Sequence, residues 1–143
     1  MTVRSLSVCL LACAVHLPAQ SAPANPLAHS QVFALNAMRA TTAPNGVVGR
    51  KVFSGTLATG EAVAVHETTQ PAGAPPSPMH RIGHSEVIVV VEGTIEFDHD
   101  EKAERAGQGS VVYVASGTLH FIRNVGSGPA TYVVVQVGGD TRQ

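Results

Sequence analysis

The sequence PMHRIGHSEVIVVVEG, residues 78–93, places two histidines and a glutamate directly before five aliphatic residues. Every second residue from His80 to Glu86 lies on one face of an extended strand, which places both histidines and the glutamate together. The aliphatic run predicts a buried strand, and the Glu-Gly pair after it predicts a tight turn. The imidazoles and the carboxylate therefore belong either to a solvated loop before a core strand or to a metal site.

The surrounding chain is predicted to consist of short strands and turns. Segments 46–58 and 61–70 flank a Thr-Gly pair and predict a hairpin, whereas the proline-rich segment 71–78 predicts a loop. Further strands are expected within residues 85–100, 110–124 and 129–137, and a charged turn region over residues 100–109. A series of short strands without a convincing helix predicts an all-β sandwich or barrel.

Length and charge limit the classes of protein to which the chain can belong. A length of 143 residues fits one domain with a single core, which we assign to residues 46–140. The net charge of −1 and the sequence pI near 6.6 indicate no basic surface of the kind that binds nucleic acid or an anionic membrane. These two classes of partner are therefore excluded, and a small molecule remains.

Residues 1–24 have the layout of a secretory signal peptide. One arginine precedes an apolar stretch, residues 6–17, which is too short to span a bilayer and is followed by small residues. We expect cleavage of this leader and export to the periplasm or the medium, with a flexible segment over residues 25–45 before the domain. A lipid-anchored form is the alternative, because the LLAC sequence that ends at Cys13 resembles a lipidation box.

Both cysteines, Cys9 and Cys13, lie within this leader. The exported domain would then contain no cysteine, which excludes disulfides and thiolate chemistry. Any metal ligands in it must be histidines or carboxylates.

The motif at residues 80–93 resembles the first of two motifs of the cupin family. The family pattern is a His-x-His pair, three or four residues, Glu, six residues and Gly. His80, Glu86 and Gly93 occupy three of these positions, but Ile82 stands where the second histidine belongs. His84 lies two residues further along and is placed to supply the missing donor.

Residues 109–124 resemble the second cupin motif. The family pattern is Gly, five residues, Pro-x-Gly, two residues, His, three residues and Asn. Gly109, Gly117, His120 and Asn124 match it, and Ala115 replaces the proline. The resemblance implies a single-domain double-stranded β-helix, which is a small jelly-roll barrel.

The resemblance also implies a metal site and an enzyme activity. Its ligands would be His80, His84, Glu86 and His120, with Glu86 as either a ligand or a general base. These nitrogen and oxygen donors suit a divalent ion of Mn, Fe, Zn, Ni or Cu and do not choose among them. Small cupins act on small organic molecules as dioxygenases, lyases, isomerases or decarboxylases, and no other cofactor is expected.

Two other functions stay open. The isoleucine at position 82 favours a noncatalytic module that binds a ligand or a metal through a degenerate site. A metal-free isomerase that uses histidine and tyrosine is the third possibility, although the basic phosphate-binding residues it would need are not evident. Metal analysis of the purified protein would separate the first two functions.

Other polar residues are predicted to lie outside the site. Val63 and Val65 share parity with Glu67, which favours a position for His66 at the rim or on the outer face. His99 lies between two aspartates in a charged segment and is predicted to be solvated.

Apolar runs at residues 87–91 and 132–135 do not alternate with polar residues. Strands that are apolar on both faces are covered on both, so we expect a homodimer. The apolar walls of the substrate pocket are assigned to Val87, Val89, Val112 and Val114. Tyr113 and Phe121 are assigned to packing.

Overall fold

The structure is a computed structural model that describes residues 25–139 and residue 141. The predicted signal peptide lies outside these residues. The elements are η1 (Leu35–Ala37), β1 (Ala40–Thr42), β2 (Val48–Thr56), β3 (Ala62–Gln70), β4 (His80–Arg81), β5 (Ser85–Glu92), β6 (Thr94–His99), β7 (Lys102–Gly107), β8 (Val111–Val114), β9 (Leu119–Asn124) and β10 (Ala130–Val137). None of the described segments forms a helix long and apolar enough to cross a membrane.

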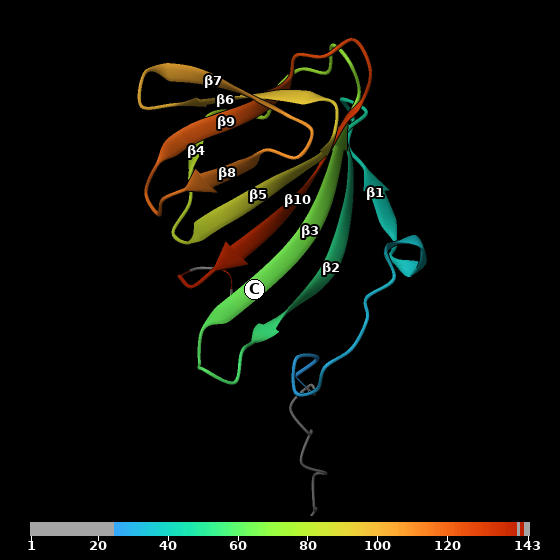
Figure 1. Cartoon of the computed structure of the whole chain (residues 1–143), viewed down its shortest axis with the longest axis vertical. Coiled ribbons are helices and arrows are strands. Elements are labelled where there is room, and N and C mark those ends of the chain that lie inside the picture. The colour runs from blue at the N-terminus through green and yellow to red at the C-terminus, as the bar shows by residue number, and fades with distance from the viewer. Residues whose placement is uncertain (1–24, 140, 142–143) are drawn as a thin grey trace, which may run out of the picture.

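Two antiparallel sheets form the barrel (Figure 1). The larger sheet has the strand order β1-β2-β3-β10-β5-β8, and the smaller one has the order β4-β9-β6-β7. Strands distant in sequence are neighbours in both sheets, as where β10 lies between β3 and β5. This arrangement confirms the predicted all-β double-stranded β-helix.

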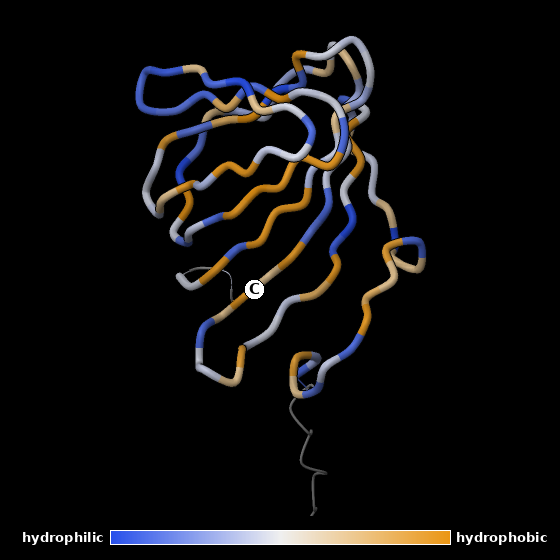
Figure 2. Tube along the Cα trace, viewed as in Figure 1, coloured by the Kyte–Doolittle hydropathy of each residue, from blue (hydrophilic) through white to orange (hydrophobic). Residues whose placement is uncertain are grey.

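The charged turn region predicted over residues 100–109 is wrong in part, because β7 occupies most of it. This strand pairs with β6 over its whole length and forms the edge of the smaller sheet. Four of its six residues are exposed. An edge strand of this kind has the polar composition of a turn, as the hydrophilic β6–β7 hairpin in Figure 2 shows.

The position of the core follows from the alternation of buried and less buried residues along β5. Glu86, Ile88 and Val90 are buried inside the barrel, while Val89 and Val91 point outward and are exposed. The core cluster consists of Ile82, Ile88, Val90, Ile95, Phe97, Ala106, Val114, Ala130, Tyr132 and Val134. The assignment of Val87 and Val89 to the pocket wall is therefore wrong, because a strand presents odd and even residues to opposite faces.

The N-terminal residues lie along β2 (Figure 1). Strand β1 pairs with β2, and the rings of Phe33 and Phe53 have centroids 4.7 Å apart. The side-chain amide of Asn25 donates to the carbonyl of Thr56 over 2.7 Å. These contacts cover the outer face of β2, and β1 adds its residues to one end of the larger sheet.

Candidate functional site

Glu86 is the centre of the candidate site. It lies on β5 with its side chain 9% exposed, and its Oε1 atom is 2.9 Å from Nε2 of His84. The side-chain amide of Gln136, on the neighbouring strand β10, donates to the same oxygen over 3.0 Å. The other carboxylate oxygen, Oε2, lies 4.0 Å from Nε2 of His120. Polar side chains from β9, from β10 and from the residues just before β5 therefore surround one buried carboxylate.

His80 and His120 are direct partners across the β4–β9 pair. Their ring centroids lie 4.7 Å apart. His120 is buried, whereas His80 is exposed at the rim.

Each of these two rings has Nδ1 at 3.1 Å from a backbone carbonyl, of Pro78 for His80 and of Thr118 for His120. A carbonyl only accepts, so Nδ1 of each neutral ring carries the proton and Nε2 keeps its lone pair. Metal-binding histidines are commonly oriented in this way by a hydrogen bond to their second nitrogen.

The chemistry of these donors fits a divalent metal, although they are not assembled around one point. Within residues 25–139 and 141, no group of three or more His, Cys, Asp or Glu side chains is arranged to hold a metal ion. Two metal–ligand bonds of about 2 Å each would span the 4.0 Å between Nε2 of His120 and Oε2 of Glu86 only with the two atoms on opposite sides of the ion, so neighbouring ligands would have to move closer together. Ile82, at the position of the missing histidine, is buried in the core.

His66 faces the interior, which corrects the prediction of a rim or outer-face position. It pairs with Val134 of the core across β3 and β10. Burial lowers the pKa of its imidazole, the charge of Glu86 partly offsets this effect, and the charges of His84 and Lys51 add to it. The ring is therefore held towards its neutral form.

Glu67 lies on the outer face of β3, where its Oε1 is 2.6 Å from Nη1 of Arg50. The valines of β3 misled the prediction because that face is also covered. On this face, Val65 of β3 pairs with Phe53 of β2, and Phe33 packs on Phe53. Apolar composition therefore could not distinguish the inside of the barrel from the outside on this strand.

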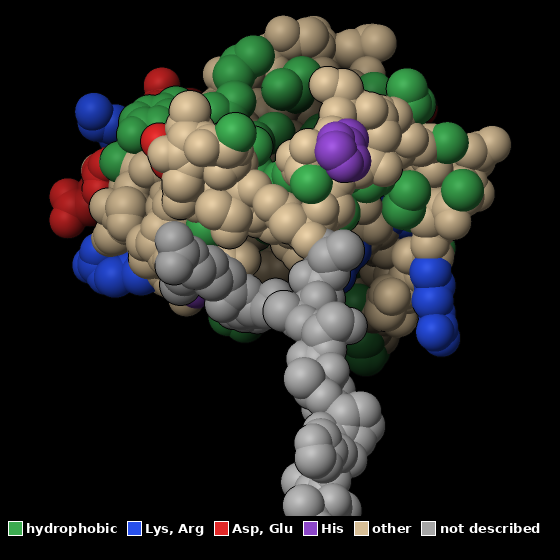
Figure 3. All heavy atoms as spheres, turned by 90° about the horizontal axis from the view of Figure 1, so that it is seen from below, with side chains coloured by type: hydrophobic (Ala, Val, Ile, Leu, Met, Phe, Trp, Pro, Cys, Tyr) green, Lys and Arg blue, Asp and Glu red, His purple; other side chains and the backbone are tan. Residues whose placement is uncertain are grey.

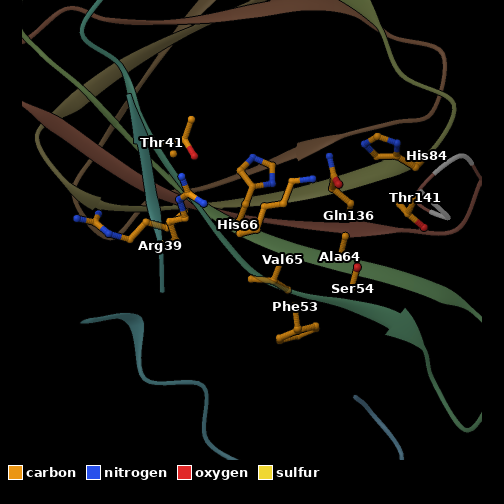
Figure 4. Close-up of a pocket in the computed structure, with 13 residues that line it drawn as sticks. Arg39, Thr41, Phe53, Ser54, Ala64, Val65, His66, His84, Gln136 and Thr141 are labelled. Carbon is orange, nitrogen blue, oxygen red and sulfur yellow. The ribbon is translucent and has the colours of Figure 1, made fainter. Parts of the chain in front are cut away.

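A cavity of about 730 Å³ lies beside Glu86. Its lining includes His84, His66 and Gln136, together with Lys51 of β2 and Arg39 before β1. Figure 4 shows His66, Gln136 and His84 on the same side of the larger sheet. The cavity therefore reaches the hydrogen-bond partners of the buried carboxylate.

Two further polar residues differ from simple expectation. His99 ends β6 and stacks on Phe97, with ring centroids 4.3 Å apart, so its side chain is only 18% exposed instead of solvated. Tyr132 is buried, and this burial raises the pKa of its phenol to about 12. The phenol therefore stays protonated at neutral pH, where it can donate a hydrogen bond or a proton but cannot act as a base.

Comparisons with known proteins agree with this architecture. The cupin domain family matches residues 65–136. An RmlC-like cupin from Shewanella frigidimarina is 17% identical and has a TM-score of 0.62, over 78% of this chain and 94% of that one. A predicted oxalate decarboxylase from Thermotoga maritima is 16% identical with a TM-score of 0.61, over 75% and 98%.

The polyketide cyclase RemF from Streptomyces resistomycificus is 14% identical with a TM-score of 0.62, over 76% of this chain and 80% of that one. A comparison with curated sequences finds no match. The chain belongs to the cupin family. Identities this low show the fold that these proteins share, and the reaction must be argued from the site.

Proposed function

We propose that the protein binds one divalent metal ion through His80, His84, Glu86 and His120 and acts on a small organic molecule. The observation that carries the proposal is the buried contact between His120 and Glu86, in which the imidazole presents Nε2 towards the carboxylate over 4.0 Å. Two of the similar proteins, the predicted oxalate decarboxylase and the polyketide cyclase, are named as enzymes and support an enzymatic role by analogy.

The bound ion would act as a Lewis acid towards a substrate oxygen. Mn, Fe, Zn, Ni and Cu all accept this donor set. The protein would contribute Glu86 as ligand or general base, and the side-chain amide of Gln136 would orient its carboxylate through Oε1. The adjoining cavity is large enough to admit a small organic molecule beside these groups.

Metal analysis of protein purified without an affinity tag tests the proposal. We expect about one equivalent of metal per chain and its loss in His120→Ala, because His120 is the buried imidazole at the carboxylate. His29→Ala is the matched control, since His29 is an exposed histidine outside the barrel strands. Failure to bind Mn, Fe, Ni or Zn on reconstitution would exclude the metal site.

A noncatalytic binding module is the second candidate. It is favoured by Ile82, which fills the position of the missing histidine with a buried apolar side chain, and by the hydrogen bonds that Glu86 already accepts. Such a protein would bind an organic ligand or a metal without converting a substrate. Incubation of ligand with reconstituted protein, followed by mass spectrometry of the ligand, distinguishes the two functions.

Two properties of the whole chain remain proposals. We propose export through the leader at residues 1–24, with the lipid-anchored form as the alternative. N-terminal sequencing of the mature protein should begin near residues 20–25, whereas a lipid-modified Cys13 would support the anchor. We also propose a homodimer.

A further inference from the structure

The cavity beside Glu86 has a cationic lining. Arg39, Arg50 and Lys51 all line it, and no described lining residue is acidic. The net charge of the whole chain is −1, so this excess of positive charge is local. Seen from below, Asp and Glu side chains gather at one margin of the molecule, whereas Lys and Arg side chains lie at both margins (Figure 3).

The three cations differ in their partners. Arg50 forms an ion pair with Glu67, so its charge is already compensated. Lys51 and Arg39 form no ion pair with any residue in the described part of the chain, 25–139 and 141. These two side chains therefore carry the uncompensated positive charge of the cavity.

Lys51 and Arg39 are both exposed, but Lys51 lies within β2 whereas Arg39 precedes β1. Lys51 pairs directly with His66 across β2 and β3, so the two side chains lie on the same face. Its charge is close enough to act on the titration of that imidazole. Gln136, one strand further along on β10, adds an amide to the same cavity (Figure 4). An ammonium group with neutral hydrogen-bonding neighbours is suited to a carboxylate.

The carboxylate of Glu86 is the opposing charge, and it acts on His66 more strongly than Lys51 does. Its Oε1 atom is hydrogen-bonded to His84 and Gln136, both of which line the cavity, whereas Glu86 itself is not a lining residue. An anion bound at the end of the cavity formed by β1 and β2 would therefore contact Lys51 and Arg39 rather than the glutamate.

We propose that this cavity selects small organic anions, carboxylates above all, with Lys51 as the principal charge partner and Arg39 at its outer end. The inference rests on the proposed function, since it names the chemical class of the small molecule bound there. Lys51 is a positioning and specificity residue, and the step it controls is binding. A cationic cavity with low-dielectric walls concentrates anions and disfavours neutral analogues of the same shape.

Calorimetric titration with succinate and its neutral diamide, succinamide, tests the inference on the mature protein with its native metal content. We expect succinate to bind at least about tenfold more tightly than succinamide, as a charge-assisted hydrogen bond would provide. Lys51→Gln should remove this preference, and Lys51→Arg should restore most of it. Lys102→Gln should keep it, because Lys102 is the only other lysine and lies on β7, outside the cavity lining.

The outcomes separate this inference from the metal site. Equal binding of succinate and succinamide, or no binding of either, would overturn it even when metal analysis finds one ion per chain. A preference for succinate that survives in Lys51→Gln would also overturn it, because the anion would then be held by the metal or by other groups. Loss of the preference in Lys51→Gln with unchanged metal content and unchanged thermal stability would support it.

Discussion

At the scale of single residues, Gly93 shows why the first cupin motif ends in glycine. Its φ is +77°, and a Cβ atom there would lie 2.4 Å from the carbonyl oxygen of Pro129. We expect Gly93→Ala to lower the free energy of unfolding by about 3 kcal/mol or more, from backbone strain and steric overlap together. Gly60 is the control, since it has a φ of +100° with no atom within 4 Å of the added methyl group.

Urea denaturation of both variants measures the difference. Gly60→Ala should cost only the backbone term, about 1–2 kcal/mol. Equal losses in the two variants would show that the contact with residues 129 and 130 is relieved by a small shift of the chain. The steric explanation for the motif glycine would then be wrong.

His99 carries a prediction about pH. Its hydrogen bond with Glu104, of 2.7 Å, is the main cause that raises the pKa of the imidazole, and Asp100 adds to the effect. A folded-state pKa above the unfolded value gives stability that is complete below the unfolded pKa and is lost as the pH rises through the folded one. Glu104→Gln removes the carboxylate that raises this pKa. We therefore expect the variant to have a lower pKa of His99, which NMR titration of the ring measures.

The control for this titration is Glu61→Gln, which changes a carboxylate hydrogen-bonded to Thr59 on the β2–β3 turn. That variant should leave the His99 titration unchanged. An unaltered pKa in Glu104→Gln would mean that the stacked Phe97 ring and Asp100 determine the protonation of this residue. The ion pair would then have no measurable role.

At the scale of elements, Asn124 joins the two sheets. It ends β9, and its side-chain amide donates to the carbonyl of Gln70 at the end of β3 over 2.9 Å and to that of Gly128 over 2.8 Å. Its Oδ1 atom accepts from the backbone N–H of Gly126. The motif asparagine therefore fixes the β9–β10 connection against the opposite sheet.

We expect Asn124→Ala to lower the free energy of unfolding by about 2–4 kcal/mol, because buried backbone groups would lose their partner. Asn45→Ala is the matched control, since the Asn45 amide bonds to Pro75 in an exposed loop and its loss should cost under about 1 kcal/mol. Chemical denaturation compares the two variants. Similar values for both would show that water replaces the buried contacts of Asn124.

The strands differ in how well local sequence predicts them. The β2–β3 hairpin, the proline-rich loop after it and β5 are recognisable from strand-forming residues bounded by turn residues, which depend on the local chain alone. Strand β7 is polar because it is an edge, and β3 is apolar on its outer face because Phe53 and its neighbours cover it. Both errors arise from contacts between segments distant in sequence, which a local pattern does not contain.

At the scale of the whole molecule, the same limit applies to the site. The motif spacing singled out His84, Glu86 and His120, whose side chains the barrel brings close together, while it did not indicate that His80 is exposed. The cavity lining from β1, β2 and β3 was missed. Those strands carry no family motif. They reach the site only because β10 pairs with β3 on one side and with β5 on the other.

The outer face of β5 and β8 leads to the last prediction. Val89, Val91, Val111 and Tyr113 are 37%, 47%, 63% and 65% exposed, and Val89 pairs directly with Val111. Tyr113, which was assigned to packing, therefore has no cover within the described part of the chain. A contiguous apolar face on neighbouring strands is typical of an interface, and a two-fold contact would bury it against its own copy.

We expect the mature protein to sediment as a dimer and Val111→Glu to shift it to a monomer, because the glutamate would place an unpaired charge at the centre of the contact. Ala103→Glu, on the exposed edge strand β7, is the control and should leave the dimer intact. Sedimentation velocity at several concentrations measures both variants. A wild-type monomer at every concentration would exclude the interface, and a dimer that survives in Val111→Glu would place it on another face of the barrel.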